Sequence, residues 1–266
     1  MALFSSPKLH LMAALAFALL AGPVAALAQT DEIQVYDGEL AEKGVFNLTI
    51  HNNFTPKGLR EAAFPGGLVN DKNLNGVAEW AYGVNDWFEA GLYLPLYSVS
   101  ASRGATINGG KVRFLFARPD AAKHKFFYGA NFEFSLNSKH WDDRRFTSEI
   151  RPIIGWHLKD VDLIVNPILD NSWYGGIKSL DFAPASRAAY NFNPKLAVAV
   201  EEYSDYGRLR DFVPAKDQWH QLWGVLDFEA GSVKIETGIG FGLTSSTDKV
   251  SLKLILSRDL NSKKPN

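Results

Sequence analysis

Apolar and polar residues alternate with a period of two along most of this chain. In the stretch VKIETGIGFGL, residues 233–243, the apolar residues fall on one side of an extended chain, while Lys234, Glu236 and three glycines fall on the other. Successive side chains of a β-strand point to opposite faces. The same alternation recurs in GVFNLTIHNN, KVRFLFARPD, YGANFEFSLNS, SEIRPIIGWHL and VSLKLILS. The pattern predicts an all-β chain whose strands each have one apolar face.

The alternation predicts twelve strands, and no window shows the sustained 3.6-residue period of a helix. The predicted strands cover residues 44–53, 76–84, 87–98, 110–117, 125–136, 146–157, 161–168, 178–190, 195–204, 217–227, 232–242 and 249–258. Tight connections are predicted at 85–86, around 119–120, and at 159–160, 191–194 and 229–231. Longer connections fall between them, at 54–75, 99–109, 137–145, 169–177, 205–216 and 243–248.

Connection lengths decide between two folds that share this alternation. A soluble antiparallel sandwich turns its apolar face inward, whereas a membrane barrel turns it outward into lipid. Short periplasmic turns alternating with longer outer loops are typical of an outer-membrane barrel. The strand lengths are close to the ~9 to 11 residues that cross a bilayer, and aromatic residues, among them Trp141, Tyr203 and Trp219, concentrate near strand ends. We predict a single antiparallel transmembrane β-barrel of about 12 strands, with a soluble periplasmic β-sandwich as the alternative.

The first residues follow the rules of export. Lys8 precedes an apolar run at residues 9–20, Gly22-Pro23 ends the run, and Ala26-Leu27-Ala28 fits a cleavage site. We therefore predict a signal peptide at residues 1–28, which directs the chain to the outer membrane. The remaining chain divides into a periplasmic N-terminal segment or plug at 29–43, the barrel at 44–260 and a C-terminal tail at 261–266.

Composition narrows the classes of partner and chemistry. The whole chain has a formal net charge of −1, and loss of Lys8 makes the mature chain one unit more negative. Such a chain has no basic excess to neutralise a phosphate backbone, so we expect no nucleic-acid partner. The chain has no Cys, which excludes disulfides, thiolate metal ligands and a Cys nucleophile. We predict no cofactor and no metal.

Three glycines on one face of the strand at 232–242 indicate a close neighbour, because glycine is otherwise a poor strand residue. We hypothesise that residues 29–43 fold into the barrel mouth and rest against Gly238, Gly240 and Gly242. The alternative interpretation is that these glycines only permit the strand to coil.

Charged side chains on the polar faces would project into the lumen, because Arg or Lys facing lipid near the midplane costs ~2 to 4 kcal/mol. These predicted pore-lining residues are Glu79, Glu89, Arg113, Glu133, Glu149, Arg151, Arg187, Glu201, Asp227, Lys234, Glu236 and Lys253. Rings of charge can set selectivity, but paired charges also cross-link a narrow barrel shut. We favour the cross-linking network and keep selectivity as the alternative.

Basic residues of the predicted outer loops have lipopolysaccharide phosphates as a natural partner, since guanidinium groups bind phosphate in bidentate fashion. The candidates are Arg144, Arg145, Arg208, Arg210 and Lys216. Ordinary solvated loop charge is the alternative. The expected partners are thus outer-membrane lipid and lipopolysaccharide, a small-molecule solute and the barrel-assembly machinery.

Catalytic motifs give little support for an enzyme. The chain has no G-x-S-x-G elbow, no H-E-x-x-H and no P-loop. A Ser/His pair could form from His140 with Ser138 or Ser148, but this signal is weak. Asp142-Asp143 beside His140 could hold a cation, although pairing with Arg144-Arg145 in a solvated loop is the favoured interpretation.

The stretches EIQVYDGELAEKGVFNLTIHNNFTP and GVAEWAYGVNDWFEAGLYLPLY resemble the meta-pathway phenol-degradation family of proteobacterial outer-membrane proteins. The resemblance is sharpest over residues 32–97. It implies a barrel that helps aromatic or other small apolar compounds cross the outer membrane, and it brings no site residues. The chain departs from many such barrels by ending in RDLNSKKPN instead of an aromatic residue, which puts the terminal assembly signal in doubt.

These observations together predict an outer-membrane channel or transporter for small molecules that works by passive selection. The resemblance favours apolar solutes, whereas the charged lumen by itself favours polar ones. The alternatives are a lipid-modifying hydrolase of the outer membrane, a structural barrel with a closed lumen, and the soluble sandwich.

Overall fold

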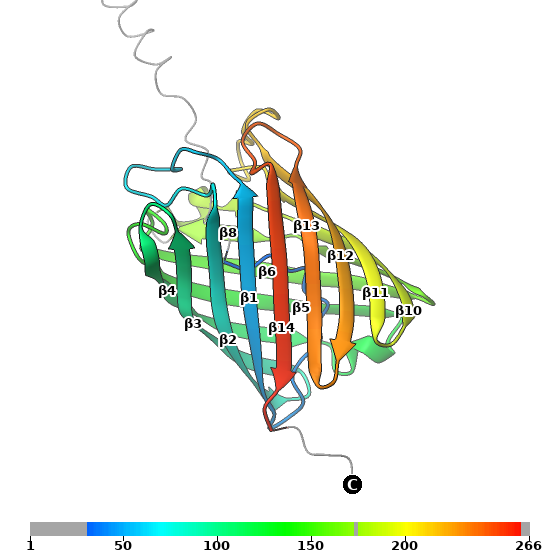
Figure 1. The fold of residues 1–266 in the computed structure, drawn as a ribbon. Coiled ribbons are helices and arrows are strands. Elements are labelled where there is room, and N and C mark those ends of the chain that lie inside the picture. The colour runs from blue at the N-terminus through cyan, green and yellow to red at the C-terminus, as the bar shows by residue number, and fades with distance from the viewer. Residues whose placement is uncertain (1–30, 173–174, 262–266) are drawn as a thin grey trace, which may run out of the picture.

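The computed structural model describes residues 31–172 and 175–261 and consists of strands arranged as one barrel (Figure 1). The strands are β1 (Phe46–Lys57), β2 (Asn73–Asn85), β3 (Phe88–Ser100), β4 (Gly104–Ala117), β5 (Phe126–Asn137), β6 (Phe146–Leu158), β7 (Val161–Asn166), β8 (Leu169–Ser172), β9 (Asp181–Phe182), β10 (Ala185–Asn193), β11 (Leu196–Asp205), β12 (Trp219–Ala230), β13 (Val233–Gly242) and β14 (Val250–Asp259). Two 3-10 turns, η1 (Ala121–Lys123) and η2 (Gly176–Ser179), complete the described elements. Neither is long or apolar enough to cross a membrane, and the described residues contain no helix that is.

Antiparallel pairing closes the sheet on itself. The strands pair in the order β5-β4-β3-β2-β1-β14-β13-β12-β11-β10-β7-β6-β8-β9, with β1 on β14 from Asn47–Asp259 to Lys57–Val250, and the pairing of β5 with β6 closes the ring. Closure satisfies the backbone N–H and C=O groups within the protein and leaves no edge strand.

Two prolines divide strands that are otherwise continuous. Asn166 pairs with Ala185 and Leu169 pairs with Phe182, so Pro167 and Pro184 lie opposite each other in the same register. Proline has no amide hydrogen to donate to the ladder. Pro167 therefore separates β7 from β8, and Pro184 separates β9 from β10 at the same level of the barrel. If β7 and β8 are counted as one interrupted strand, and β9 and β10 as another, the sheet is a closed antiparallel barrel of twelve strands. This confirms the predicted fold class.

Connections at the two ends of the barrel differ in length, with two departures from the prediction. The short end has turns at 86–87, 159–160, 194–195 and 231–232, and the other end has loops at 58–72, 138–145, 206–218 and 243–249. The predicted long loop at 99–109 is wrong, because the connection covers only 101–103. Thr106 and Asn108 continue the inward face of β4 while Ile107 points outward with 61% exposure. The short-end connection at 118–125 is longer than predicted and includes η1.

Burial is inverted relative to a water-soluble protein. Phe114 and Leu254 on the outer surface are each 38% exposed, whereas Lys253 is 1% exposed and Glu201 is fully buried. Charged residues are almost never buried in a soluble domain unless they are paired. An apolar exterior around a charged interior, together with the closed barrel, excludes the β-sandwich alternative.

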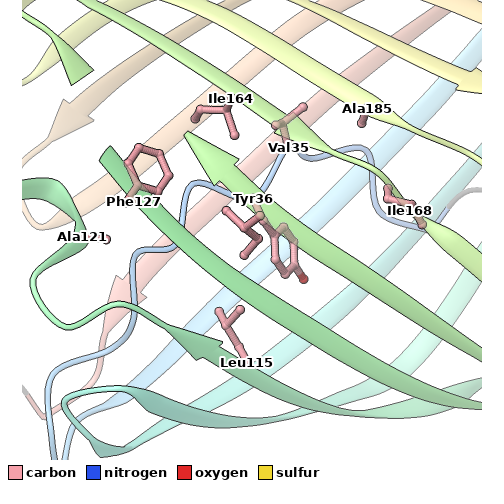
Figure 2. Packing of buried hydrophobic residues seen from close by; sticks show 9 residues of the cluster. Val35, Tyr36, Leu115, Ala121, Phe127, Ile164, Ile168 and Ala185 are labelled. Carbon is pink, nitrogen blue, oxygen red and sulfur yellow. The ribbon is translucent and has the colours of Figure 1, made fainter. Parts of the chain in front are cut away.

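Residues 31–45, called the N-terminal segment below, run through the interior of this barrel. Val35 and Tyr36 pack there against strand residues that include Phe127, Ile153 and Ile164 (Figure 2). Ile33 packs in a second buried cluster with Ala189, Ala199, Trp223 and Val225. Apolar side chains on the inner wall, both aliphatic and aromatic, thus form a core between the barrel and the N-terminal segment.

Candidate functional site in the barrel lumen

The predicted pore-lining residues lie on the inner faces of their strands, and the structure joins them into ion pairs. Lys234 is the exception in position, because it lies at the short end of the barrel with 62% of its side chain exposed and pairs with Glu39 at 2.6 Å. Their role in permeation stays a prediction.

One group of charges, the Lys253 network, consists of Arg187, Glu201, Asp227, Glu236 and Lys253. Each residue comes from a different strand of the consecutive set β10 to β14. Lys253 Nζ lies 2.5 Å from both Glu201 and Glu236, and the Arg187 guanidinium pairs with Glu201, Asp227 and Glu236. The network therefore links five neighbouring strands across the inner wall.

A second group, the Arg113 network, performs the same linkage on β1 to β4. Arg113 pairs with Glu79 at 2.7 Å and with Glu89, and His51 Nε2 lies 3.1 Å from Glu79. Glu89 also accepts a hydrogen bond from the backbone N–H of Ala41 in the N-terminal segment. His51 was not among the predicted lumen charges, although it shares the inward parity of Asn47, Thr49 and Asn53.

A third group, the segment network, joins the N-terminal segment to β4, β5 and β6. It consists of Asp31, Glu32, Lys111, Glu133, Glu149 and Arg151. Lys111 Nζ lies 2.8 Å from Asp31 and 3.2 Å from Glu133, while Arg151 pairs with Glu149 at 2.6 Å. Lys111 was missed at the sequence level, but it has the same strand parity as Arg113.

Glu32 is the member of the segment network without a hydrogen bond. Its side chain is 2% exposed, and its nearest cation, Arg151, is 3.9 Å away. Neither carboxylate oxygen has a hydrogen-bond partner within residues 31–172 and 175–261. Burial raises the pKa of Glu32 from 4.5 to about 7, and the neighbouring Glu133 carboxylate adds to this shift while Arg151 opposes it.

Side chains of the wall also hold the backbone of the N-terminal segment. The Asn166 amide accepts a hydrogen bond from the Tyr36 N–H at 2.7 Å and donates one to the Tyr36 carbonyl at 3.0 Å. Arg151 donates to the Gln34 carbonyl at 2.9 Å, and Lys253 donates to the Ile33 carbonyl at 3.2 Å from the other wall. Such contacts satisfy backbone groups that would otherwise be buried without partners.

The N-terminal segment comes close to Gly83 and not to the three glycines that the sequence indicated. A Cβ on Gly240 would lie 2.2 Å from the Trp223 ring, and Trp223 is the direct cross-strand partner of Gly240. The expectation that the N-terminal segment rests on Gly238, Gly240 and Gly242 is therefore wrong, because neighbouring side chains and loop atoms occupy that space. The segment instead lies against Gly83 of β2, where a Cβ would be 2.2 Å from the Glu42 carbonyl oxygen.

Above the N-terminal segment, toward the long loops, lies a cavity of about 200 Å³. Trp141, Tyr203 and Trp219 line it, so these three rings lie inside the barrel and not in an outer aromatic belt as predicted. Exposed aromatic pairs do occur at the short end, including Phe46 with Tyr82 and others such as Phe126 with Trp156. Within the described part of the chain, no three His, Asp or Glu side chains are grouped so as to hold a metal ion.

The arginines proposed for lipopolysaccharide differ in their surroundings. Arg144 is 24% exposed, pairs with Asp142 at 3.1 Å and Asp181 at 3.4 Å, and lines the cavity. It is therefore turned inward and held by carboxylates. Arg145, Arg208, Arg210 and Lys216 are exposed at the long-loop end.

The part of the chain that the structure describes contains two Ser/His hydrogen bonds, and neither leaves a serine hydroxyl accessible beside a free base. Ser138 contacts His140 Nε2 at 3.1 Å as predicted, but Asn108 contacts the same nitrogen at 3.0 Å. Ser204, on the outer face, lies 2.7 Å from His220 Nδ1, and His220 Nε2 lies 3.0 Å from the side-chain oxygen Oε1 of Gln218. Ser204 is only 3% exposed, and its hydroxyl also contacts Glu202.

Comparison with known proteins identifies the fold but no family. The chain matches no protein-family model, and no curated protein matches it. Among solved structures it is similar to the COG4313 outer membrane channel from Pseudomonas putida F1, with a TM-score of 0.59 and 13% identity over 86% of this chain and 100% of that one.

Two porins have the same kind of fold. The NanC porin has a TM-score of 0.52 and 12% identity, covering 81% of this chain and 100% of its own. The KdgM porin, solved in complex with disordered oligogalacturonate, has a TM-score of 0.52 and 8% identity, covering 81% and 99%. The barrel is thus a fold found in outer-membrane channels.

Proposed function

We propose that this protein is an outer-membrane channel or transporter for small molecules, exported by the signal peptide at residues 1–28, which lies outside the described residues. The observation that carries the proposal is the inverted burial of a closed barrel, with apolar side chains outside and ion-paired side chains inside. Such a surface is compatible with lipid, and a polar lumen is a route for solutes. Similarity to channels and porins supports the same conclusion.

The N-terminal segment acts in this proposal as a resident plug. It lies in the lumen, packs on both walls and forms ion pairs through Asp31 and hydrogen bonds through its backbone. A barrel of about twelve strands is narrow, so a segment inside it leaves little continuous space. Solute passage therefore requires the segment to shift or leave.

The solute and the surface partners belong to the same proposal. Resemblance over residues 32–97 suggests aromatic or other small apolar compounds as solutes. Arg145, Arg208 and Arg210 are exposed at the long-loop end, where lipopolysaccharide phosphates would meet them. The barrel-assembly machinery would insert the chain into the outer membrane.

Planar-bilayer recording of the folded mature protein tests the channel. We expect discrete conductance steps that are small and infrequent, because the plug occupies the lumen. Heat-modifiable gel mobility of the same sample would first establish that the barrel is folded. A folded barrel that gives no conductance steps, with or without the plug, would identify a structural barrel with a closed lumen instead.

Deletion of residues 31–43 tests the plug. We expect a several-fold larger conductance because the deletion removes the contacts with both walls and opens the lumen. The matched control removes residues 60–65 of the outer loop at 58–72, which are exposed or half-buried, and keeps Leu68, which packs against Trp141. Unchanged conductance in the folded deletion variant would contradict a plug.

One arrangement favours a second candidate function, the hydrolysis of a lipid ester at the outer rim. Ser204, His220 and Gln218 have the order of a nucleophile, a base and a group that orients the base. The burial of Ser204 opposes this function, because a substrate carbonyl cannot reach its hydroxyl. Phospholipid hydrolysis in detergent that is lost in Ser204→Ala, and retained in Ser138→Ala, would establish it over the channel.

A further inference from the structure

The cavity above the N-terminal segment has the size of one small organic molecule. Its volume is about 200 Å³, and it lies between residues 31–34, the loop at 138–145 and the inner faces of β5, β6, β8 and β11. An apolar protein cavity of about 150 Å³ is large enough to hold a benzene molecule. The space therefore fits a solute with one ring or a comparable alkyl body.

Carboxylates dominate the ionisable groups around this space. Seven acidic residues line it: Asp31, Glu32, Glu133, Asp142, Glu149, Asp170 and Asp205. They face three basic ones, Lys111, Arg144 and Arg151, and each of these is already paired with at least one carboxylate. The basic side chains are thus engaged, and an excess of negative charge faces the cavity.

Glu32 indicates where a positive charge would be bound. It lines the cavity, its side chain is 2% exposed, and neither of its oxygens has a hydrogen-bond partner among the described residues. A buried carboxylate without a donor is costly, and an ammonium group with three N–H donors would relieve that cost.

Aromatic side chains line the same cavity. Trp141, Trp219 and Tyr203 lie in its wall together with the aliphatic side chains of Ile33 and Ile168. Aromatic faces attract organic cations and also pack against apolar bodies. A bare metal ion would use neither feature, and no group of carboxylates and histidines within residues 31–172 and 175–261 has the arrangement of a metal site.

We propose that this cavity binds a small organic monocation, a protonated amine whose ammonium group pairs with Glu32 and whose ring or alkyl body packs against Trp219 and Trp141. The inference rests on the proposed channel function, because it names the class of solute that the lumen selects. It also reconciles a charged lumen with an aromatic lining at one site.

Binding of an amine should strengthen with pH. Burial raises the pKa of Glu32 to about 7, so its carboxylate is largely protonated at pH 6 and largely ionised at pH 8, whereas an alkylammonium remains charged. The charged and titratable groups that face Glu32 come from six strands and from the N-terminal segment itself: His51 on β1, Glu79 on β2, Tyr93 on β3, Lys111 on β4, Glu133 on β5, Arg151 on β6 and Tyr36. If only the ionised form of Glu32 binds, affinity rises about tenfold from pH 6 to pH 8.

Calorimetric titration of the full mature protein in detergent micelles tests the inference. The probes are 2-phenylethylamine, its neutral analogue 2-phenylethanol, the anion 3-phenylpropionate, and KCl or MgCl2 alone. We expect the amine to bind at least about tenfold more tightly than the alcohol at pH 8, as for a charge-assisted hydrogen bond. The anion and the inorganic salts should give no saturable heat.

Glu32→Gln provides the decisive variant, because it keeps the side-chain volume and removes the charge. We expect it to lose about tenfold in amine affinity and all of the pH dependence, with Asp170→Asn losing less. Glu61→Gln, an exposed residue of the loop at 58–72, is the matched control and should bind as the parent does. The variants in the same detergent correct for partition of the probe into micelles.

Each outcome decides the inference separately from the channel. Equal affinity for amine and alcohol, or unchanged amine binding in folded Glu32→Gln, would overturn the amine site. Saturable heat with MgCl2 alone would replace it with a metal site. Because titration needs no membrane, conductance without amine binding refutes only this inference, whereas amine binding without conductance refutes only the channel.

Discussion

Two of the ion-pair networks in the lumen differ in the parts of the chain that supply their residues. The Lys253 network takes all five residues from neighbouring strands, whereas the segment network takes two of its carboxylates from a piece of chain that no strand includes. In the Lys253 network each cation contacts at least two carboxylates. In the segment network Glu32 has no hydrogen-bond donor among residues 31–172 and 175–261.

This difference separates a fixed cross-link from a detachable contact. Strands of a closed barrel cannot part without breaking the backbone ladder, so charges placed between them add to a structure that is already locked. The N-terminal segment is held by side chains and packing, and its network has an excess of carboxylate. We therefore expect changes in the Lys253 network to affect chiefly the stability of the barrel, with a smaller effect on docking because Lys253 also donates to the Ile33 carbonyl. Changes in the segment network should affect docking of the segment.

The largest expected effect comes from Lys253→Met. The substitution leaves Glu201, which is fully buried, and Glu236 without their shared ammonium, and breaking a buried ion pair costs about 3–5 kcal/mol. Urea unfolding of the folded barrel in micelles should show this loss in free energy of unfolding. Lys234→Met is the matched control, and an equal loss in both variants would show that burial of the network is unimportant.

The next largest effect is a pH-dependent release of the N-terminal segment. The pKa of Glu32 is about 7 when docked, against 4.5 when free. Docking therefore binds a proton, and its stability is complete below pH 4.5 and decreases as pH rises toward 7. The loss is on the order of 3 kcal/mol, or about a hundredfold in the undocked fraction.

Thiol labelling can measure that release, because the chain has no Cys of its own. Ile33→Cys would report exposure of the segment, and Ser102→Cys in the exposed turn at 101–103 would correct for the intrinsic pH dependence of the thiol. The corrected rate should rise between pH 5 and pH 8, and Glu32→Gln should abolish the rise. A corrected rate that is flat in both proteins would assign Glu32 no part in docking.

Gly83→Ala should loosen the segment by a smaller amount and without any change of charge. The added methyl group would lie 2.2 Å from the Glu42 carbonyl oxygen, and such overpacking costs about 1–3 kcal/mol. The labelling rate of Ile33→Cys should rise accordingly. Gly224→Ala is the matched control, since no atom lies within 4 Å of its Cβ, and equal rates in the two variants would place the segment away from β2.

The strands could be predicted from sequence because each depends on a local period that the barrel preserves. Alternation placed Arg187, Glu201 and Lys253 on one face, and antiparallel neighbours then brought them together. The end of the strand at Ser172 was missed because Pro167 interrupts its pattern, and the strand at 104–117 was shortened because its outer end has only Ile107 to mark the apolar face.

Contacts of the N-terminal segment could not be predicted in the same way. A segment without periodicity gives no register, and its partners, such as Asn166 for Tyr36, are distant in sequence. The glycines at 238–242 did indicate a close neighbour, but the neighbour of Gly240 is its cross-strand partner Trp223. Trp141 enters the cavity because loop folding, which has no local signal, decides which way it points, whereas Trp219 begins β12 with the inward parity of Gln221 and Trp223.

Lys234→Met should have the smallest effect, because it removes an exposed contact of the N-terminal segment and leaves the buried contacts in place. Lys234 pairs with Glu39 of the N-terminal segment at 2.6 Å, but 62% of the Lys234 side chain and 53% of the Glu39 side chain are exposed. Exposed pairs contribute about 0–1 kcal/mol because water and salt screen them. The free energy of unfolding should change by at most about 1 kcal/mol, and the labelling rate of Ile33→Cys should stay within about fivefold of the parent. A release as large as that of Gly83→Ala would instead make this exposed pair, and not the buried contacts, the anchor of the segment.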